Sequence, residues 1–171
     1  VRGLAALLAV VALTAHAQDK TALTTEREKA SYMVGMDVAN SLAPAAQEID
    51  MAAFERAVRN AFEGKKPLID ENTARETNQQ LMQRLTSRNG QQPGATQPLP
   101  AVSKENAGLL IGADVGRSLA PVKDDIDLAV MLQAIRTSFA KGKLLLTEDE
   151  ARAIGASFSQ KQQARLEAAA Q

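Results

Sequence analysis

Gly35-Met-Asp-Val-Ala-Asn-Ser-Leu-Ala-Pro44 returns 77 residues later as Gly112-Ala-Asp-Val-Gly-Arg-Ser-Leu-Ala-Pro121. The match extends without a gap from Gly35–Arg75 onto Gly112–Arg152, and 18 of these 41 positions are identical. A fixed offset with so many identities indicates an internal duplication. Any function of the chain must therefore explain why one unit is present twice.

The composition predicts helices. The chain has 171 residues, which the duplication divides into two units of about 65 residues each. Aromatic residues make up only 3% and Trp is absent, so Ala, Leu, Val and Met must fill the core, which suits helix packing better than a sheet. We predict an all-α protein with a first repeat over 21–88, a linker over 89–102 and a second repeat over 103–171.

Residues 1–17 have the features of a secretory signal peptide. Arg2 precedes an apolar run from Leu4 to Leu13, and Ala15-His-Ala17 has the small-x-small pattern of a cleavage site. About ten apolar residues are too few to span a bilayer, and a short buried helix is the alternative. We expect an exported, periplasmic protein that begins at Gln18 after cleavage, with cell-surface association as a second location.

Cleavage after Ala17 would leave no His and no Cys, and 19 Lys and Arg against 20 Asp and Glu. Disulfides, thiol nucleophiles, imidazole bases and zinc sites built on His or Cys are then excluded. Near-neutral, interspersed charges also lack the basic footprint of a nucleic-acid-binding protein. We expect no cofactor, no metal and no nucleic-acid partner.

The first repeat predicts three helices, and their expected N-caps are short polar residues: Thr25, Asp50 and Asp70. Glu28 would complete a capping box with Thr25. Pro44 ends the first helix, and Gly64 is a candidate left-handed residue after the second. The third helix runs to about Arg88 and is polar over most of its circumference, which is typical of a spacer arm or of an ordinary exposed helix.

The second repeat follows the same plan after a Pro- and Gln-rich linker from Asn89 to Ala101. Its expected N-caps are Ser103, Asp127 and Thr147, and Glu150 would form a capping box with Thr147. Both ends of the chain look cut. Val1 stands where an initiator Met belongs, unless a start codon is misread as Val, and the helical pattern has no stop signal before Gln171. We expect a longer parent protein.

The segment Ala30-Ser-Tyr-Met-Val-Gly-Met-Asp-Val38, followed by Ile49-Asp50 and a helix from Phe54 to Phe62, resembles a known family. It is similar to the N-terminal domain of FKBP-type peptidyl-prolyl cis-trans isomerases of the macrophage infectivity potentiator type. In that family the domain is a dimerisation module whose first two helices intertwine with those of a second subunit. The resemblance implies self-association and a role in protein folding, with unfolded or folding polypeptides as partners.

The chain departs from this family in two ways, because it has two such units and nothing in it resembles the catalytic FKBP barrel. The family's active site is an aromatic-lined pocket, whereas the five aromatic residues here fall at helical core spacing: Tyr32, Phe54, Phe62, Phe139 and Phe158. No catalytic residue is therefore assigned within 1–171. The expected function is the dimerisation and chaperone-like N-terminal region of an exported isomerase. A stand-alone, non-enzymatic periplasmic chaperone or interaction module is the alternative.

Three glycines inside predicted helices, Gly35, Gly112 and Gly116, each cost roughly 1 kcal/mol relative to Ala. Close helix crossings would compensate for this cost, and tolerated surface positions are the alternative. Asp37 and Asp114 beside them are expected on solvated faces or in ion pairs with Arg, not as an acid–base pair. The methionines are expected in the core or at the self-association surface more than on a polypeptide-binding surface: Met33, Met36, Met51 and Met82.

The duplication, together with the family resemblance, predicts an internal dimer: two tandem three-helix units that form an intertwined, pseudo-dimeric helical bundle with a long, solvated final helix. A three-helix unit of about 65 residues buries little surface alone, and a linker of roughly a dozen residues holds the second unit at millimolar effective concentration. We predict a pseudo-twofold interface, with Gly35 and Gly112 at its crossings, in which one set packs against the other: Tyr32, Met36, Phe54, Val58 and Phe62 against Leu109, Ala113, Met131, Ile135 and Phe139. A conventional homodimer is the alternative.

Overall fold

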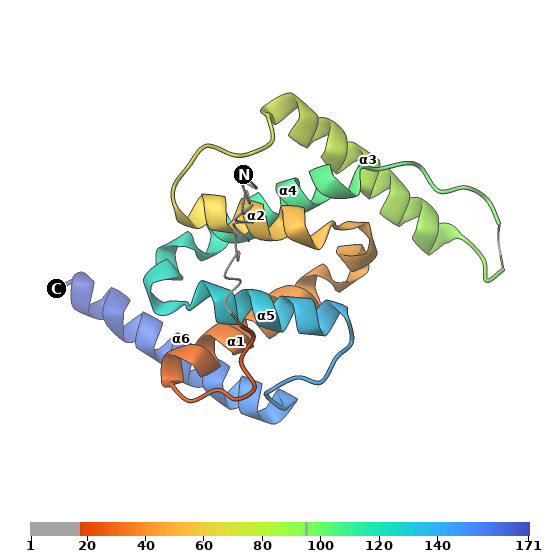
Figure 1. Ribbon diagram of the computed structural model, residues 1–171. Coiled ribbons are helices and arrows are strands. Elements are labelled where there is room, and N and C mark those ends of the chain that lie inside the picture. Colours follow the sequence, from red (N-terminus) through yellow and green to blue (C-terminus); the bar gives the residue numbers. More distant parts are fainter. Residues whose placement is uncertain (1–17, 95) are drawn as a thin grey trace, which may run out of the picture.

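The two repeats form the same succession of helices in a computed structural model, which describes residues 18–94 and 96–171 (Figure 1). The helices of the first repeat are α1 Glu26–Leu42, η1 Ala43–Glu48, α2 Met51–Phe62 and α3 Glu71–Gly90. Those of the second are α4 Lys104–Leu119, η2 Ala120–Asp125, α5 Leu128–Phe139 and α6 Glu148–Ala169. The described residues contain no strand, so the predicted all-α class is confirmed. The predicted signal peptide lies outside the described residues.

All six predicted N-caps are confirmed. In each, the side chain accepts a hydrogen bond from the backbone N–H three residues on: Thr25, Asp50, Asp70, Ser103, Asp127 and Thr147. Thr147 and Glu150 form the predicted capping box. The box predicted for Thr25 is wrong, because the Glu28 carboxylate accepts from the Thr24 N–H at 2.8 Å, one residue before the cap. The other oxygen of the same carboxylate pairs with the Lys20 ammonium at 2.8 Å.

The helix ends also follow the sequence. Pro44 is near the start of η1, so α1 ends two residues before it. Gly64 has φ +67° after α2, as predicted for a left-handed position. Lys141 occupies the equivalent place after α5 with φ +54°, where a side chain is strained. The third helix reaches Gly90, two residues beyond the predicted end, and the linker then runs to Ser103.

The two repeats exchange their first helices. The largest helix–helix interfaces are those of α1 with α5 and of α4 with α2, and both cross from one repeat to the other. α6 also packs on α1, and α3 packs on α4. The molecule therefore has an α1 lobe (α1, α5, α6) and an α4 lobe (α4, α2, α3), seen as the lower and upper halves of Figure 1. The predicted intertwined, pseudo-dimeric bundle is confirmed.

One hydrophobic cluster joins the two lobes. Its largest side chains are fully buried: Tyr32, Phe54, Val58, Val130, Met131, Leu132 and Ile135. The Tyr32 hydroxyl accepts a hydrogen bond from the Leu145 N–H at 3.2 Å, which ties α1 to the loop before α6. Met33 and Met36 are buried as predicted, whereas Met82 on α3 is half exposed. The core thus depends on side chains from both repeats.

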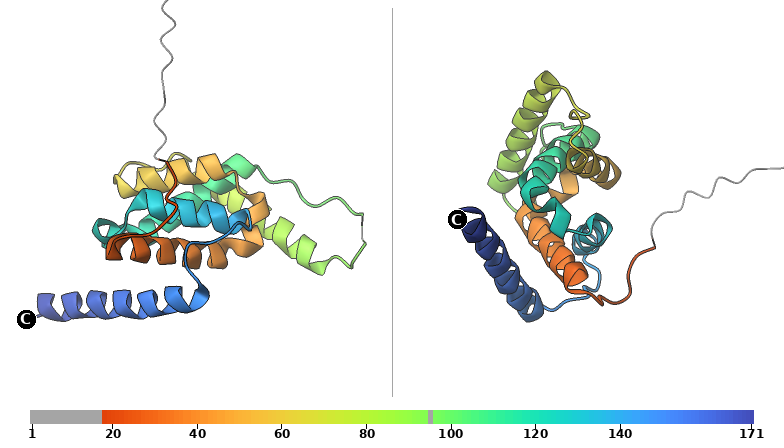
Figure 2. Two further views of the ribbon diagram at one scale, coloured as in Figure 1. Left: turned by 60° about the horizontal axis from the view of Figure 1, so that its bottom comes forward. Right: turned by 90° about the vertical axis from the view of Figure 1, so that its left-hand side faces the viewer.

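The third helices lie on the outside of the bundle, at its two ends (Figure 2). Ala151 alone is buried on α6, and only Thr77 and Leu81 are buried on α3. The predicted long, solvated final helix is confirmed. Among the described residues, no helix combines the length and the apolar character needed to cross a bilayer.

Candidate association interface and grooves

Gly35 and Gly112 lie at two equivalent helix crossings. A Cβ added to Gly35 would collide with the Met131 carbonyl oxygen and lie 2.7 Å from the Ala134 Cβ on α5. A Cβ added to Gly112 would collide with the Phe54 carbonyl oxygen and lie 2.8 Å from the Ala57 Cβ on α2. Because backbone carbonyls cannot move away as flexible side chains do, these two glycines set how closely the helices approach. The prediction of close crossings is confirmed.

The α4 crossing uses glycine over a longer stretch than the α1 crossing does. Added Cβ atoms would lie 2.6 Å from the Asp50 carbonyl oxygen at Gly108 and 2.5 Å from the Ala61 Cβ at Gly116. The equivalent positions on α1 hold Ser31 and Ala39, and both are buried. The crossing of α1 with α5 therefore accommodates two side chains that the crossing of α4 with α2 excludes.

The Ser31 hydroxyl, which the equivalent Gly108 lacks, forms a hydrogen bond between the two repeats. Its Oγ donates to the Arg27 carbonyl and accepts from the Asp127 N–H, both at 2.7 Å. At the other crossing the Asp50 N–H donates directly to the Lys104 carbonyl at 2.9 Å. Both N-caps are thus held by the first helix of the other repeat, through a side chain in one case and through backbone in the other.

The residues predicted for the association interface fall into two clusters. Most of them lie in or against the main core: Tyr32, Met36, Phe54, Val58, Phe62, Met131, Ile135 and Phe139. Leu109 and Ala113 instead pack with Ala53, Ala57 and Ile69 in a smaller cluster beside α2. This pair therefore lies outside the main core that holds the other predicted interface residues. Where Gly108 and Gly112 bring α4 against α2, the side chains that face them are those of Ala53 and Ala57.

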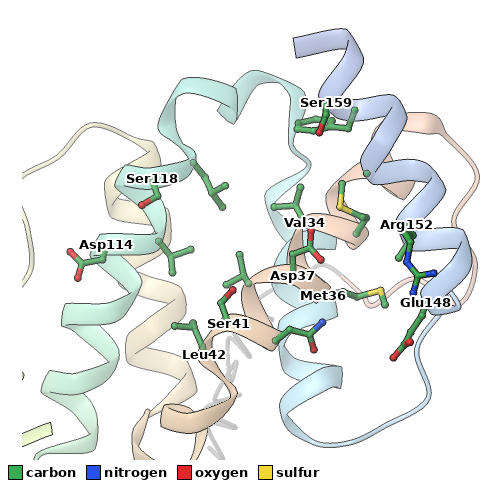
Figure 3. A pocket seen from close by; sticks show the side chains of 18 of the residues that line it. Val34, Met36, Asp37, Ser41, Leu42, Asp114, Ser118, Glu148, Arg152 and Ser159 are labelled. Atoms are coloured by element: carbon green, nitrogen blue, oxygen red, sulfur yellow. The ribbon is translucent and has the colours of Figure 1, made fainter. Parts of the chain in front are cut away.

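A groove of about 1080 Å³ lies between α1, α4 and α6, and we call it the α6 groove (Figure 3). Its apolar lining includes three pairs related by the 77-residue offset: Val34 and Ile111, Val38 and Val115, Leu42 and Leu119. Phe158 and Gly155 of α6 form part of the third wall. The groove therefore lies between equivalent faces of the two first helices, at the pseudo-twofold axis.

Charged groups also line the α6 groove: Asp37, Asp114, Glu148 and Arg152, all exposed. Asp114 forms an ion pair with Arg117, and Arg152 pairs with Asp149 at 3.2 Å along its own helix. Asp37 and Asp114 are thus exposed groove residues, and the prediction of an ion pair with a neighbouring Arg is confirmed for Asp114. The sequence did not reveal this groove, because its walls come from both repeats.

A second, smaller groove of about 600 Å³ lies between α3 and α4, and we call it the α3 groove. Most of its lining is equivalent to lining of the α6 groove, with Leu110, Ala113 and Arg117 in place of Met33, Met36 and Asn40. On the third helices, Asn78 replaces Gly155, while Glu71 and Arg75 correspond to Glu148 and Arg152. The duplication has produced one kind of groove twice, with different side chains.

Each third helix is held to the 3-10 helix of its own repeat by ionic contacts. Glu48 is buried and accepts from Arg84 at 2.6 Å and from Arg88 at 3.0 Å. Asp125, at the equivalent position, accepts from Arg165 at 2.5 Å and from Gln162 at 3.2 Å. The Arg165 guanidinium is the main cause that lowers the pKa of Asp125. These contacts hold each third helix against its own repeat.

The residues before α1 form a strap across α5. The side-chain amide of Gln133 accepts from the Lys20 N–H at 2.7 Å and donates to the Lys20 carbonyl at 2.8 Å. Arg136 pairs with Asp19 at 2.7 Å and also with Glu55. The sequence analysis did not single out Gln133. Its signal was a polar residue within an otherwise apolar run of α5, where its amide is buried.

Lys20 also secures the strap to α1. Its ammonium lies 2.8 Å from the Glu28 carboxylate. This bond, followed by the one from the Thr24 N–H, lowers the pKa of Glu28 to about 2. The described residues contain no group of three or more His, Cys, Asp and Glu that could hold a metal ion.

Comparison with known proteins supports the duplication. Residues 27–98 and 104–171 each match the family model of the domain amino terminal to FKBP-type peptidyl-prolyl isomerase. No match was found among curated proteins or among solved structures.

Proposed function

Because the chain belongs to the family of domains that stand amino-terminal to FKBP-type peptidyl-prolyl isomerases, we propose that it is a self-association module in which two repeats of one chain replace two subunits. The exchange of first helices carries this proposal. α1 has its main partners, α5 and α6, in the second repeat, and α4 has its main partners, α2 and α3, in the first. Neither lobe can therefore form from one repeat alone.

The linker favours pairing within the chain over pairing between chains. It joins α3 to α4 through residues 91–103, and the Arg84 guanidinium donates to the Pro100 carbonyl at 3.0 Å. A tether of this length gives the second repeat an effective concentration on the order of millimolar. A homodimer made by exchange between two chains would bury the same surfaces but would have to compete with this intramolecular pairing.

Sedimentation equilibrium tests the proposal, and a monomer at micromolar concentration is the expected result. A protease site introduced at Gln91–Gln92 in the linker gives a second test. After cleavage, the two fragments should still elute together under native conditions, because the exchanged helices α1 and α4 hold them to each other. A stable dimer of uncut chains, or separation of the fragments under native conditions, would refute internal pairing. The uncut variant serves as the control.

The second part of the proposal is a chaperone-like role in protein folding, in which the α6 groove takes apolar segments of unfolded or folding polypeptides. The supporting observation is its size together with its apolar floor of Val34, Val38, Ile111 and Val115. Suppression of aggregation of a chemically unfolded client is the expected activity. The chain should not accelerate proline-limited refolding, and a rate increase proportional to its concentration would reject this part.

Export to the periplasm completes the proposal and rests on the signal-like pattern over 1–17. Protein recovered from a periplasmic extract should begin at Gln18. An intact Val1 terminus on cytosolic protein would reject export without affecting the self-association module. A stand-alone chaperone and the N-terminal region of a longer isomerase both fit this proposal, and sequencing of the gene beyond Gln171 distinguishes them.

A further inference from the structure

The two grooves have opposite charge balances. Asp37, Asp114 and Glu148 line the α6 groove against one cation, Arg152. The α3 groove has two cations, Arg75 and Arg117, against one carboxylate, Glu71. In a homodimer the two grooves would have to be identical, because one sequence would build both. Joining the repeats in one chain has allowed them to differ.

The grooves also differ in the space that they offer. Met33 and Met36 back the α6 groove where Leu110 and Ala113 stand in the other, and flexible thioether side chains adapt to bound apolar groups. Gly155 has no side chain at the position that Asn78 occupies on α3. A Cβ added to Gly155 would have the Met33 sulfur as its nearest neighbour, at 3.6 Å. The larger, more acidic groove is therefore also the one with the more adaptable lining.

We propose that the α6 groove selects apolar polypeptide segments that carry Lys or Arg at their flanks. This inference rests on the proposed polypeptide-binding role and adds a substrate class to it. Apolar side chains contact the floor at Val34, Ile111 and their neighbours, while cationic flanks lie near Asp37 and Glu148 (Figure 3). Asp114 is already paired with Arg117 and contributes less. These carboxylates are exposed, so they contribute selectivity and faster association more than affinity.

Two labelled peptides with the same apolar centre, one flanked by Lys and one by Glu, test the inference by fluorescence anisotropy on the full chain. The Lys-flanked peptide should bind about tenfold more tightly at low salt, because several exposed charge pairs change sign together. Raising the salt to about 0.5 M should remove most of this difference through screening. Glu148→Gln should weaken binding of the Lys-flanked peptide roughly threefold.

Pairs of variants at equivalent positions of α3 and α6 show which groove binds the peptides. Glu71→Gln changes the equivalent carboxylate of the α3 groove and should leave the affinity unchanged. Ser159→Trp places a large side chain in the α6 groove, at an exposed position, and should abolish binding of both peptides. Met82→Trp, at the equivalent exposed position of α3, should not.

The possible outcomes test the charge selectivity and the polypeptide-binding role separately. Equal affinity for the Lys- and Glu-flanked peptides would overturn the charge selectivity and leave the polypeptide-binding role in place. Binding of neither peptide would overturn both. An equal loss in Glu71→Gln and Glu148→Gln, or in Met82→Trp and Ser159→Trp, would show that the α6 groove is not the site.

Discussion

The α1 lobe and the α4 lobe have the same arrangement of helices but different residues at several equivalent positions. Two identical subunits could not differ in this way, because one sequence would build both. Ser31 on α1 stands where Gly108 lies on α4, and Lys141 after α5 stands where Gly64 follows α2. The main crossings at Gly35 and Gly112 have stayed the same. The two lobes therefore share the glycines that set how closely the helices approach and differ at positions around them.

The largest expected effect is at the shared crossings. Gly35→Ala and Gly112→Ala should each destabilise the chain by about 2–3 kcal/mol, because the new methyl group meets a backbone carbonyl on the facing helix. Chemical denaturation should give similar losses for the two variants. A loss at one crossing only would contradict their equivalence.

Gly155→Ala on α6 is the control for these variants. Its Cβ would make an ordinary contact with the Met33 sulfur, so removal of a helical glycine should stabilise the chain by up to about 1 kcal/mol. A large loss at this position, where no backbone carbonyl faces the new methyl group, would mean that the losses at Gly35 and Gly112 do not depend on their close crossings.

Ser31→Ala tests the bond that only the α1 lobe has. The Asp127 N–H would lose its acceptor in a buried place, which costs about 1–2 kcal/mol. Ser41→Ala, at an exposed position of the same helix, should change the free energy of unfolding by less than about 0.5 kcal/mol. Equal effects of the two variants would reject a special role for Ser31.

Lys141→Gly should make the two lobes more alike and the chain more stable by about 0.5–1 kcal/mol, because a left-handed backbone strains a residue that has a side chain. The reciprocal change, Gly64→Lys, should lower stability by about 1 kcal/mol, since that glycine also has a positive φ and no neighbour within 4 Å of an added Cβ. Thermal and urea denaturation measure both. Opposite signs for this pair are the decisive result.

The smallest effect is on pH dependence and concerns the strap. The pKa of Glu28 is lowered to about 2 from its usual value near 4.5, so its stabilising contribution is present above about pH 4.5 and is lost as the pH falls toward 2. Glu28→Gln should lower the melting temperature at neutral pH and reduce its fall in acid. Glu105→Gln, at the equivalent place in an exposed pair with Arg56, should change neither.

The limits of sequence reasoning follow from particular residues. Gly64 could be predicted because glycine prefers a left-handed backbone after a helix, but Lys141 at the same place carried no such signal. The contacts of Glu28 were missed because its partners, the Thr24 N–H and the Lys20 ammonium, lie outside the capping-box pattern. Gln133 could have been flagged as a polar residue in an apolar run, although its partner is the Lys20 backbone, which no side-chain pattern identifies.

The sequence alone determined the duplication, the helices and their caps, the glycine crossings and the family, because each depends on local propensity or on residues a fixed distance apart. The tertiary structure decided which helix meets which: α1 with α5 and α4 with α2. The family resemblance predicts an intertwined pair, but exchanged and unexchanged arrangements bury the same apolar faces, so the pattern of those faces by itself cannot distinguish them. The two grooves and their opposite charges depend on that exchange, because α1 and α6, or α3 and α4, become neighbours only across the two repeats.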